Sequence, residues 1–207
     1  MEKTLEQVKQ LRKKTYDYDD EVAESIGVQS NEIPVNVFPM IFNKLTLGLE
    51  LLNYYLEIWR KIIRPKSSSL EEAKKENRER VITIQRMIFI EVMSSIEFCF
   101  KEYVKKYPEK IDNITGRIYL SKIINKSNER DIVINSESTL WEGIIELRNA
   151  LVHNNGISDE TAEYVYPNCK LILCENKMIQ GDLKLFLNLI DWLLDSVKSW
   201  IFEMNKR

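Results

Sequence analysis

Residues suited to chemistry on a phosphodiester are concentrated in one short stretch, residues 147–156, which reads LRNALVHNNG. It contains His153, the only histidine of the 207 residues, and Arg148, which lies five positions before it. Cleavage of a phosphodiester needs a fixed cation for the phosphate and a proton-transfer group that works near pH 7, and arginine and neutral imidazole supply the two. Asn149 follows the arginine directly, and Asn154 follows the histidine. The stretch therefore predicts acid–base chemistry on a phosphate ester.

Each of these residues also has a structural interpretation. A histidine at the end of a helix interacts favourably with the helix dipole and with the last carbonyl groups. Arg148 has the alternative of an ion pair with Glu97 or Glu91, which lie beside the apolar seam of an earlier helix. The sequence Asn-Asn-Gly at residues 154–156 is typical of a helix C-cap. The elements around the stretch have to decide between the two interpretations.

The composition narrows the classes of partner and cofactor. The net charge is −2, so the chain has no overall basic field and any nucleic-acid binding must be local. One histidine and three cysteines (Cys99, Cys169 and Cys174) without CxxC spacing argue against a zinc site, so we expect reduced thiols, no metal and no cofactor. No apolar run reaches the roughly 18 residues of a membrane span, and the first residues lack the apolar segment of a signal peptide. We therefore expect a cytoplasmic protein without a membrane partner.

The first third of the sequence predicts an N-terminal helical extension, residues 1–70, that packs on the core. Residues 4–25 are highly charged, have apolar residues at loose helical spacing, and predict a peripheral helix interrupted near residues 16–20. Residues 27–39 predict a connector, because two prolines interrupt any helix there. Residues 40–63 carry an apolar seam with alternating spacings of four and three, which is typical of one helix face.

The main domain is expected to span residues 71–207. Pro65 ends the preceding helix, and Ser69 with a glutamate three positions later predicts a capping box that starts the next one. This helix should reach about residue 107, with its charged first turns, residues 71–80, either solvated or projecting past the body. Its apolar seam is flanked by Glu97 and Lys101, which a solvated helix flank explains but which we also keep as auxiliary site candidates.

Four further elements complete the predicted fold. They are a short helix over residues 117–125, a motif helix over 138–155, a hairpin within 162–179 and a C-terminal helix over 182–204. The motif helix has a serine or threonine available as its N-cap at residue 136, 138 or 139. We predict an all-α fold, a helical bundle with a small β-hairpin between the motif helix and the C-terminal helix.

The motif helix has an unusually wide apolar surface. At 100° per residue, one group of apolar side chains falls within about 60° and predicts the core face, and a second group lies roughly 120–160° further round. The first group is Leu140, Ile144, Leu147 and Leu151, and the second is Trp141, Ile145 and Val152. Arg148 lies between the two groups. A stripe this wide requires two neighbours, and a second copy of the chain is the simplest candidate for the other one.

The expected chemistry also favours two copies. Arg148 and His153 point about 140° apart on a helix, so alone they frame a site poorly. Cleavage of RNA by its own 2′-hydroxyl needs a base, an acid for the leaving 5′-oxygen, and cations on the developing phosphorane. A chain with a single histidine supplies a His–His acid–base pair only by dimerising. We therefore predict a homodimer through the motif helix.

The motif resembles the R-x4-6-H signature of HEPN domains: arginine, a polar residue, an apolar segment, then histidine near a helix end. The resemblance covers roughly residues 78–204, including the preceding amphipathic helices and the C-terminal helix. It implies a helical bundle that dimerises through the motif helices and acts as a metal-independent endoribonuclease in toxin–antitoxin or antiviral defence systems. By this resemblance Arg148 binds the scissile phosphate, His153 is the general base or acid, and Asn149 orients His153 or the phosphate. The partners implied are an RNA substrate and an antitoxin or other defence protein.

Two other functions stay open at this point. One is a non-catalytic HEPN-like module that binds a nucleotide, an RNA or a protein, and the other is a structural helical adaptor. The absence of net positive charge mildly favours both. The chain also departs from the subfamily neutralised by nucleotidyltransferase antitoxins, because Asn155 stands where that subfamily has tyrosine.

Overall fold

The computed structural model describes residues 2–61, 70–111, 114–179 and 183–206. This part of the chain has six α-helices, a short 3-10 helix and a two-stranded antiparallel hairpin, which confirms the all-α class and the place of the hairpin before the last helix. The elements are α1 (Glu2–Ile26), α2 (Val37–Lys61), α3 (Leu70–Lys106), η1 (Pro108–Lys110), α4 (Leu120–Glu129), α5 (Asn135–His153), β1 (Ala162–Tyr166), β2 (Cys169–Leu173) and α6 (Leu185–Asn205).

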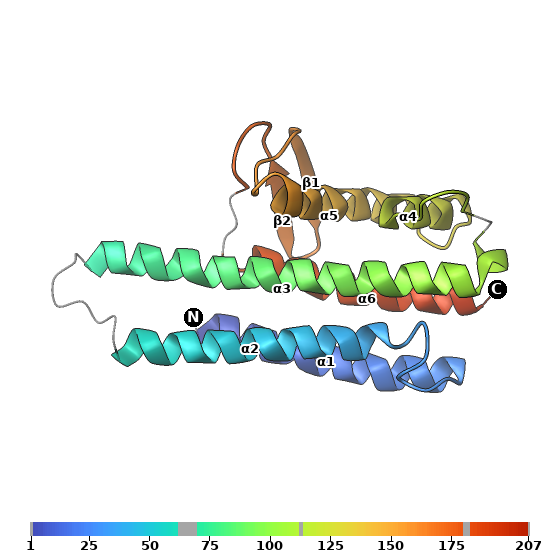
Figure 1. Cartoon of the computed structure of the whole chain (residues 1–207), viewed down its shortest axis with the longest axis horizontal. Helices are drawn as coiled ribbons and strands as arrows, with labels where there is room; N and C mark the ends of the chain where they lie inside the picture. The colour runs from blue at the N-terminus through green and yellow to red at the C-terminus, as the bar shows by residue number, and fades with distance from the viewer. Residues whose placement is uncertain (1, 62–69, 112–113, 180–182, 207) are drawn as a thin grey trace.

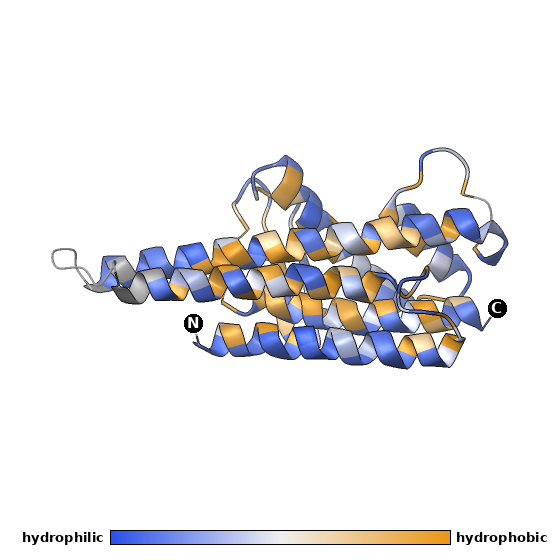
Figure 2. Cartoon of the chain, turned by 60° about the horizontal axis from the view of Figure 1, so that its bottom comes forward, coloured by the Kyte–Doolittle hydropathy of each residue, from blue (hydrophilic) through white to orange (hydrophobic). Residues whose placement is uncertain are grey.

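The helices form three layers, and α3 and α6 make up the middle one. Figure 1 shows α1 and α2 on one side of this layer, and α4, α5 and the hairpin on the other. The buried apolar side chains form one continuous cluster to which all six helices contribute. Figure 2 shows hydrophobic residues on the sides of the helices that face one another and hydrophilic residues on the outer sides. The helix that carries the motif, α5, therefore rests on α3 and α6.

The two N-terminal helices are longer than predicted. α1 continues through residues 16–20, so the predicted interruption is wrong. α2 begins at Val37, inside the predicted connector, because a proline is tolerated in the first turn of a helix, where its missing N–H has no partner to lose. The first turns of α3, residues 71–80, are mostly exposed and project past the body, as predicted (Figure 1). The predicted stop at Pro65 and capping box at Ser69 lie outside the described residues.

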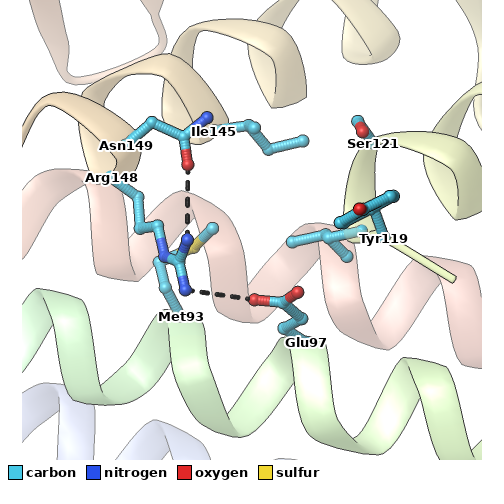
Figure 3. Close-up of a pocket in the computed structure, with 8 residues that line it drawn as sticks. Met93, Glu97, Tyr119, Ser121, Ile145, Arg148 and Asn149 are labelled. Carbon is cyan, nitrogen blue, oxygen red and sulfur yellow. Dashed lines mark hydrogen bonds and ion pairs between the residues drawn. The ribbon is translucent and has the colours of Figure 1, made fainter. Parts of the chain in front are cut away.

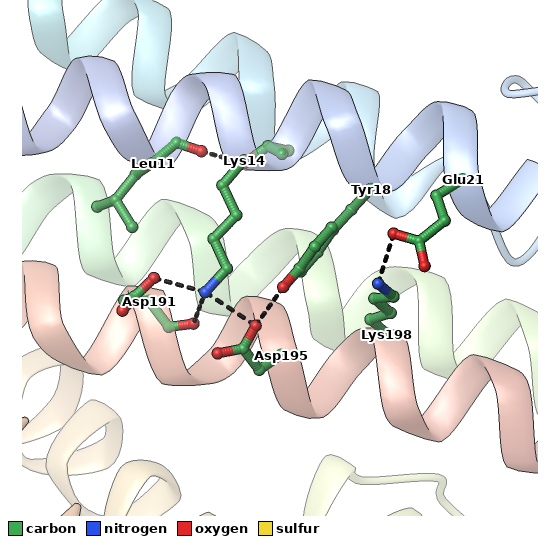
Figure 4. Close-up of polar contacts among 8 residues, drawn as sticks. Leu11, Lys14, Tyr18, Glu21, Asp191, Asp195 and Lys198 are labelled. Carbon is green, nitrogen blue, oxygen red and sulfur yellow. Dashed lines mark hydrogen bonds and ion pairs between the residues drawn. The ribbon is translucent and has the colours of Figure 1, made fainter. Parts of the chain in front are cut away.

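A polar seam attaches α1 to α6. The Lys14 Nζ lies 2.6 Å from Asp191 Oδ1 and 2.8 Å from Asp195 Oδ1, and the Tyr18 hydroxyl donates to Asp195 Oδ1 at 2.5 Å. Burial and this carboxylate raise the pKa of Tyr18, so the hydroxyl keeps its proton and stays a donor. Figure 4 shows these contacts in a row along the two helices. The seam ties the N-terminal helices to the last helix, while the division into two domains at residue 70 stays a prediction.

The elements around the motif are placed as predicted but differ at their ends. α4 begins three residues later than predicted. It also ends four residues later, because Ser127 is buried and accepts a hydrogen bond from the Trp200 indole at 2.9 Å. α5 begins three residues earlier than predicted, and its N-cap, Ile134, makes no side-chain cap, so the predicted serine or threonine cap is wrong. α6 begins at Leu185, and its predicted start at residue 182 lies outside the described residues.

The hairpin packs with β1 against α5 and with β2 against α6 of the middle layer (Figure 1). The Tyr166 hydroxyl donates to the backbone carbonyl of Leu140 at 2.7 Å. The Tyr164 ring lies directly on Gly143, where a Cβ atom would come within 2.5 Å of the ring. Glycine at this position permits the close approach of the strand. α5 is thus held between the middle layer and the hairpin, which fixes the direction of the motif side chains.

Candidate functional site

The C-terminal end of α5 positions His153. The helix ends at this residue, and the backbone N–H groups of Asn154 and Gly156 both donate to the Ala150 carbonyl, at 3.1 and 2.8 Å. Asn155 and Gly156 have positive φ angles of 54° and 81°, a conformation that asparagine and glycine adopt with little strain. The C-cap interpretation of this segment is therefore confirmed. His153 is left exposed on the last turn of the helix.

The buried face of α5 differs from the predicted core face. Trp141 is fully buried, and its indole Nε1 donates to Ser196 Oγ of α6 at 2.9 Å, so it belongs to the core. Leu140 and Leu151 are only half-buried. Val152 is 42% exposed. The chain thus covers most of the apolar surface of α5 itself, and the width of that surface no longer requires a second copy.

Arg148 lies between two acceptors. Its Nη2 donates to Glu97 Oε2 of α3 at 3.3 Å, and its Nη1 donates to Asn149 Oδ1 at 3.3 Å. Figure 3 shows the guanidinium between these two side chains. The other carboxylate oxygen of Glu97 lies 2.5 Å from Lys101 Nζ. Glu97 therefore bridges two cations, which confirms the ion pair with Glu97 that the sequence offered as an alternative; Glu91 instead pairs with Lys44 at 2.7 Å.

Two adjoining hollows meet at this ion pair. The smaller, a cleft of about 110 Å³, lies beside Asn149 and extends under α4. The larger, an open groove of about 500 Å³, extends toward the end of α5. The side chains that line both are Glu97, Tyr119 and Arg148. The groove is also lined by Ser94, Phe98, Lys101, Arg117 and His153.

The structure brings most of the predicted site residues together. Arg148 and His153 line the same groove although they lie on different sides of α5, because the groove is open and reaches the helix end. Glu97 and Lys101 are close to Arg148, and Asn149 lines the cleft. Asn154 does not join them: it is absent from the lining of both hollows, and its Nδ2 donates to Asp159 Oδ2 at 2.5 Å.

Four residues of the groove, Ser94, Phe98, Arg117 and Tyr119, were not predicted from the sequence. Arg117 and Tyr119 precede α4, and Phe98 projects from α3. The Arg117 guanidinium carbon lies 5.3 Å from the centre of the Tyr119 ring, and Lys122 Nζ lies 5.9 Å from it. The close sequence spacing of an aromatic residue and two cations was the available signal, since this combination is typical of nucleic-acid binding segments.

The outer side of α5 has the opposite charge. Burial raises the pKa of the Glu146 carboxyl, and the charges of Glu160, Glu142 and Asp159 raise it further. Burial and Glu160 likewise raise the pKa of Tyr164 to about 12. On the helix, Glu142 and Glu146 lie within about 60° of Asn149 and His153, so this acidic surface borders the groove at its His153 end.

Neither a cluster of metal ligands nor similarity to known proteins adds to the description of the site. The described residues contain no group of three or more His, Cys, Asp or Glu side chains able to hold a metal ion. None of the helices in the described ranges is long and apolar enough to span a membrane. None of the protein families, curated proteins or solved structures compared with the chain matches it. The fold and the site define an all-α protein with a cationic groove at the end of one helix.

Proposed function

We propose that the protein is a metal-independent endoribonuclease of the HEPN type. The observation that carries the proposal is that Arg148 and His153 line one open groove together with two further cations, Lys101 and Arg117. Phosphodiester cleavage needs cations near the phosphate and a proton-transfer group beside them, and the groove supplies both. In this proposal Arg148 binds the scissile phosphate, and Asn149, which accepts a hydrogen bond from it, fixes its orientation.

The reaction is attack of the ribose 2′-oxygen on the adjacent phosphorus. The 2′-hydroxyl loses its proton to a base, the P–O5′ bond breaks, and the leaving 5′-oxygen takes a proton from an acid. The products are a 2′,3′-cyclic phosphate and a 5′-hydroxyl. Each chain has one histidine, so we propose that two copies meet at the ends of their α5 helices and contribute one His153 each. The exposed Val152 and Ile157 next to His153 offer apolar contacts for this interface.

Cleavage of a labelled RNA oligonucleotide in the presence of EDTA tests the proposal. We expect wild-type protein to produce 2′,3′-cyclic phosphate ends. His153→Ala and Arg148→Ala should each lower the rate at least 100-fold, since general acid–base catalysis contributes about 10²–10⁴-fold and one donor to the developing charge about 10²–10³-fold. Arg78→Ala is the matched control, because this arginine is exposed on the projecting part of α3. Undiminished cleavage by both motif variants would show that a contaminating nuclease is responsible and would overturn the proposal.

The dimer needs its own measurement. We expect sedimentation to show a dimer for the wild type and for His153→Ala, because the histidine acts on the substrate. In mixtures of His153→Ala with wild-type chains, activity should fall with the square of the wild-type fraction, since only wild-type pairs contain two histidines. A linear fall would show that each chain acts alone.

A non-catalytic nucleotide- or RNA-binding module is the second candidate. It is favoured by the ion pair with Glu97, which already occupies Arg148. This candidate predicts RNA binding without turnover. A role in toxin–antitoxin or antiviral defence would follow from the ribonuclease, and it predicts that expression of wild-type protein, but not of His153→Ala, arrests growth of a bacterial host.

A further inference from the structure

Tyr119 occupies an unusual position at the mouth of the groove. It is the N-cap residue of α4, yet its side chain makes no capping hydrogen bond and is 42% exposed. Arg117 and Lys122 lie over its ring, and the Lys122 Nζ is held there by the backbone carbonyl of Arg117 at 3.2 Å. Helix capping therefore does not explain the tyrosine, which presents an aromatic surface among exposed cations.

Phe98 presents a second aromatic surface to the same groove. It projects from α3 and is 51% exposed. None of the ring pairs found among the described residues includes Phe98 or Tyr119, although nine other aromatic residues of the middle and outer layers pack against each other. Two large aromatic side chains thus reach solvent where the groove also carries Arg148 and His153.

The charges near the groove select an anionic ligand. Its lining has three cations (Lys101, Arg117 and Arg148) against one carboxylate, Glu97, in a chain whose net charge is −2. Glu142 and Glu146 border the groove at its His153 end, so a polyanion is held where the cations lie, beside α3 and the start of α4. Exposed aromatic rings interleaved with cations are what single-stranded nucleic acids bind, because each base stacks on a ring while the phosphates meet the cations.

We propose that Tyr119 and Phe98 are base-stacking residues that hold unpaired nucleotides on either side of the phosphate at Arg148. This inference rests on the proposed ribonuclease function, because it names the substrate of the same groove: a single-stranded segment of RNA. Bases of a double helix are stacked on each other and cannot reach the two rings. Arg117 and Lys122 are exposed, so they move from the Tyr119 ring to the phosphates when a base takes their place.

Binding to full-length His153→Ala protein tests the inference without turnover. The probe is a single-stranded RNA with 2-aminopurine at one position, whose fluorescence falls when the base stacks on a ring. In this background Tyr119→Ala and Phe98→Ala should each weaken binding about 10-fold and reduce the fluorescence change, because stacking on one aromatic ring is worth about that factor. Tyr119→Phe should bind like the parent. Tyr54→Ala is the control, since Tyr54 is also an exposed aromatic residue but lies on α2, away from the groove.

The salt dependence of RNA binding distinguishes the contribution of the cations from that of the aromatic rings. Arg117→Ala should reduce the slope of log K against log salt by about 0.7, the value for one phosphate contact of a single strand, whereas Tyr119→Ala should leave the slope unchanged. The inference is overturned if Tyr119→Ala and Phe98→Ala bind like the parent, if a duplex of the same sequence binds as tightly as the single strand, or if the parent binds no RNA, which would point to a protein partner.

The outcomes also distinguish this inference from the ribonuclease proposal. If a base stacks on Tyr119 but the wild-type protein does not cleave RNA, the base-stacking role is supported and the ribonuclease proposal is rejected. The opposite result is that the wild type cleaves RNA, with the activity lost in His153→Ala and unchanged in Tyr119→Ala and Phe98→Ala. That result supports the ribonuclease proposal and rejects the base-stacking role.

Discussion

Trp141 fixes the position of α5 on α6, and with it the positions of Arg148 and His153. Its side chain is fully buried, and its Nε1 donates to Ser196 Oγ at 2.9 Å. Ser196→Ala removes the acceptor and leaves the indole N–H buried without a partner, which costs about 1–3 kcal/mol. For a chain of this length each kcal/mol lowers the Tm by about 2–4 °C. We expect the free energy of unfolding to fall by about 2 kcal/mol and the Tm by roughly 4–8 °C.

Urea unfolding followed by tryptophan fluorescence measures this effect. Ser199→Ala is the matched control: this serine is exposed on the same helix, and its replacement should change the free energy of unfolding by less than about 0.5 kcal/mol. Trp141→Phe removes the donor, so in that background Ser196→Ala should cost at least about 1 kcal/mol less than in the wild type. If Ser196→Ala is as stable as Ser199→Ala, the hydrogen bond does not hold α5 in place and the reasoning is refuted.

Three further predictions concern the hairpin, the acidic surface and the α1–α6 seam. Gly143→Ala should lower the Tm, because the Cβ would come within 2.5 Å of the Tyr164 ring; overpacking costs about 1–3 kcal/mol and exceeds the gain of about 1 kcal/mol in helix propensity. The raised pKa of Glu146 means that the folded state binds its proton more tightly than the unfolded state, so its contribution to stability is present at low pH and is lost as the pH rises through the folded pKa. Glu146→Gln should therefore stabilise the protein at pH 7 and have little effect at about pH 4, measured by urea unfolding across this range. Lys14→Met should cost about 1 kcal/mol at low salt and less in 1 M NaCl, because it leaves Asp191 and Asp195 without their shared cation.

Each of these predictions has a result that contradicts it. A Tm for Gly143→Ala equal to or above that of the wild type would show that the hairpin moves aside without cost. Glu146→Gln should be compared with Glu175→Gln, an exposed glutamate beyond the hairpin, and an equal effect of both would exclude the burial argument. If the loss of stability in Lys14→Met does not depend on salt, the seam is stabilised by packing rather than by charge.

The helices were predictable where their signals are local. The alternating spacings of four and three in α2 and α3 depend only on residues within two turns, and both helices are present. The predicted break in α1 was wrong because Lys14 and Tyr18 find partners on α6, about 177 positions away, which stabilise the helix across residues 15–20, where its own propensity is weak. The late end of α4 depends in the same way on Trp200, which donates to the buried Ser127. Such ends are set by tertiary partners, and no local pattern contains them.

The residues of the candidate site likewise divide into those with a local sequence signal and those placed by tertiary contacts. Arg148, Asn149 and His153 lie within one helix, so spacing alone identified them, and Glu97 was found as a charge beside an apolar seam. Arg117 and Tyr119 lie about 30 positions earlier and reach the groove only because α4 packs on α3 and α5. The assignment of Trp141 to a second face failed because a helical wheel shows directions and not neighbours. α5 is covered by the middle layer and by the hairpin, and the hairpin's place was not known from the wheel.

The ion pair of Arg148 with Glu97 is compatible with binding an anion, although it first suggests a purely structural arginine. Glu97 is shared between Arg148 and Lys101, so two cations face one carboxylate and one positive charge stays uncompensated. The Arg148 side chain is 26% exposed and lines both hollows, which leaves it accessible to a phosphate. Binding of a phosphate therefore needs only one chain. In the proposed cleavage the second proton-transfer group is the His153 of another copy, so the proposed ribonuclease and the proposed homodimer stand or fall together, while the binding module depends on neither.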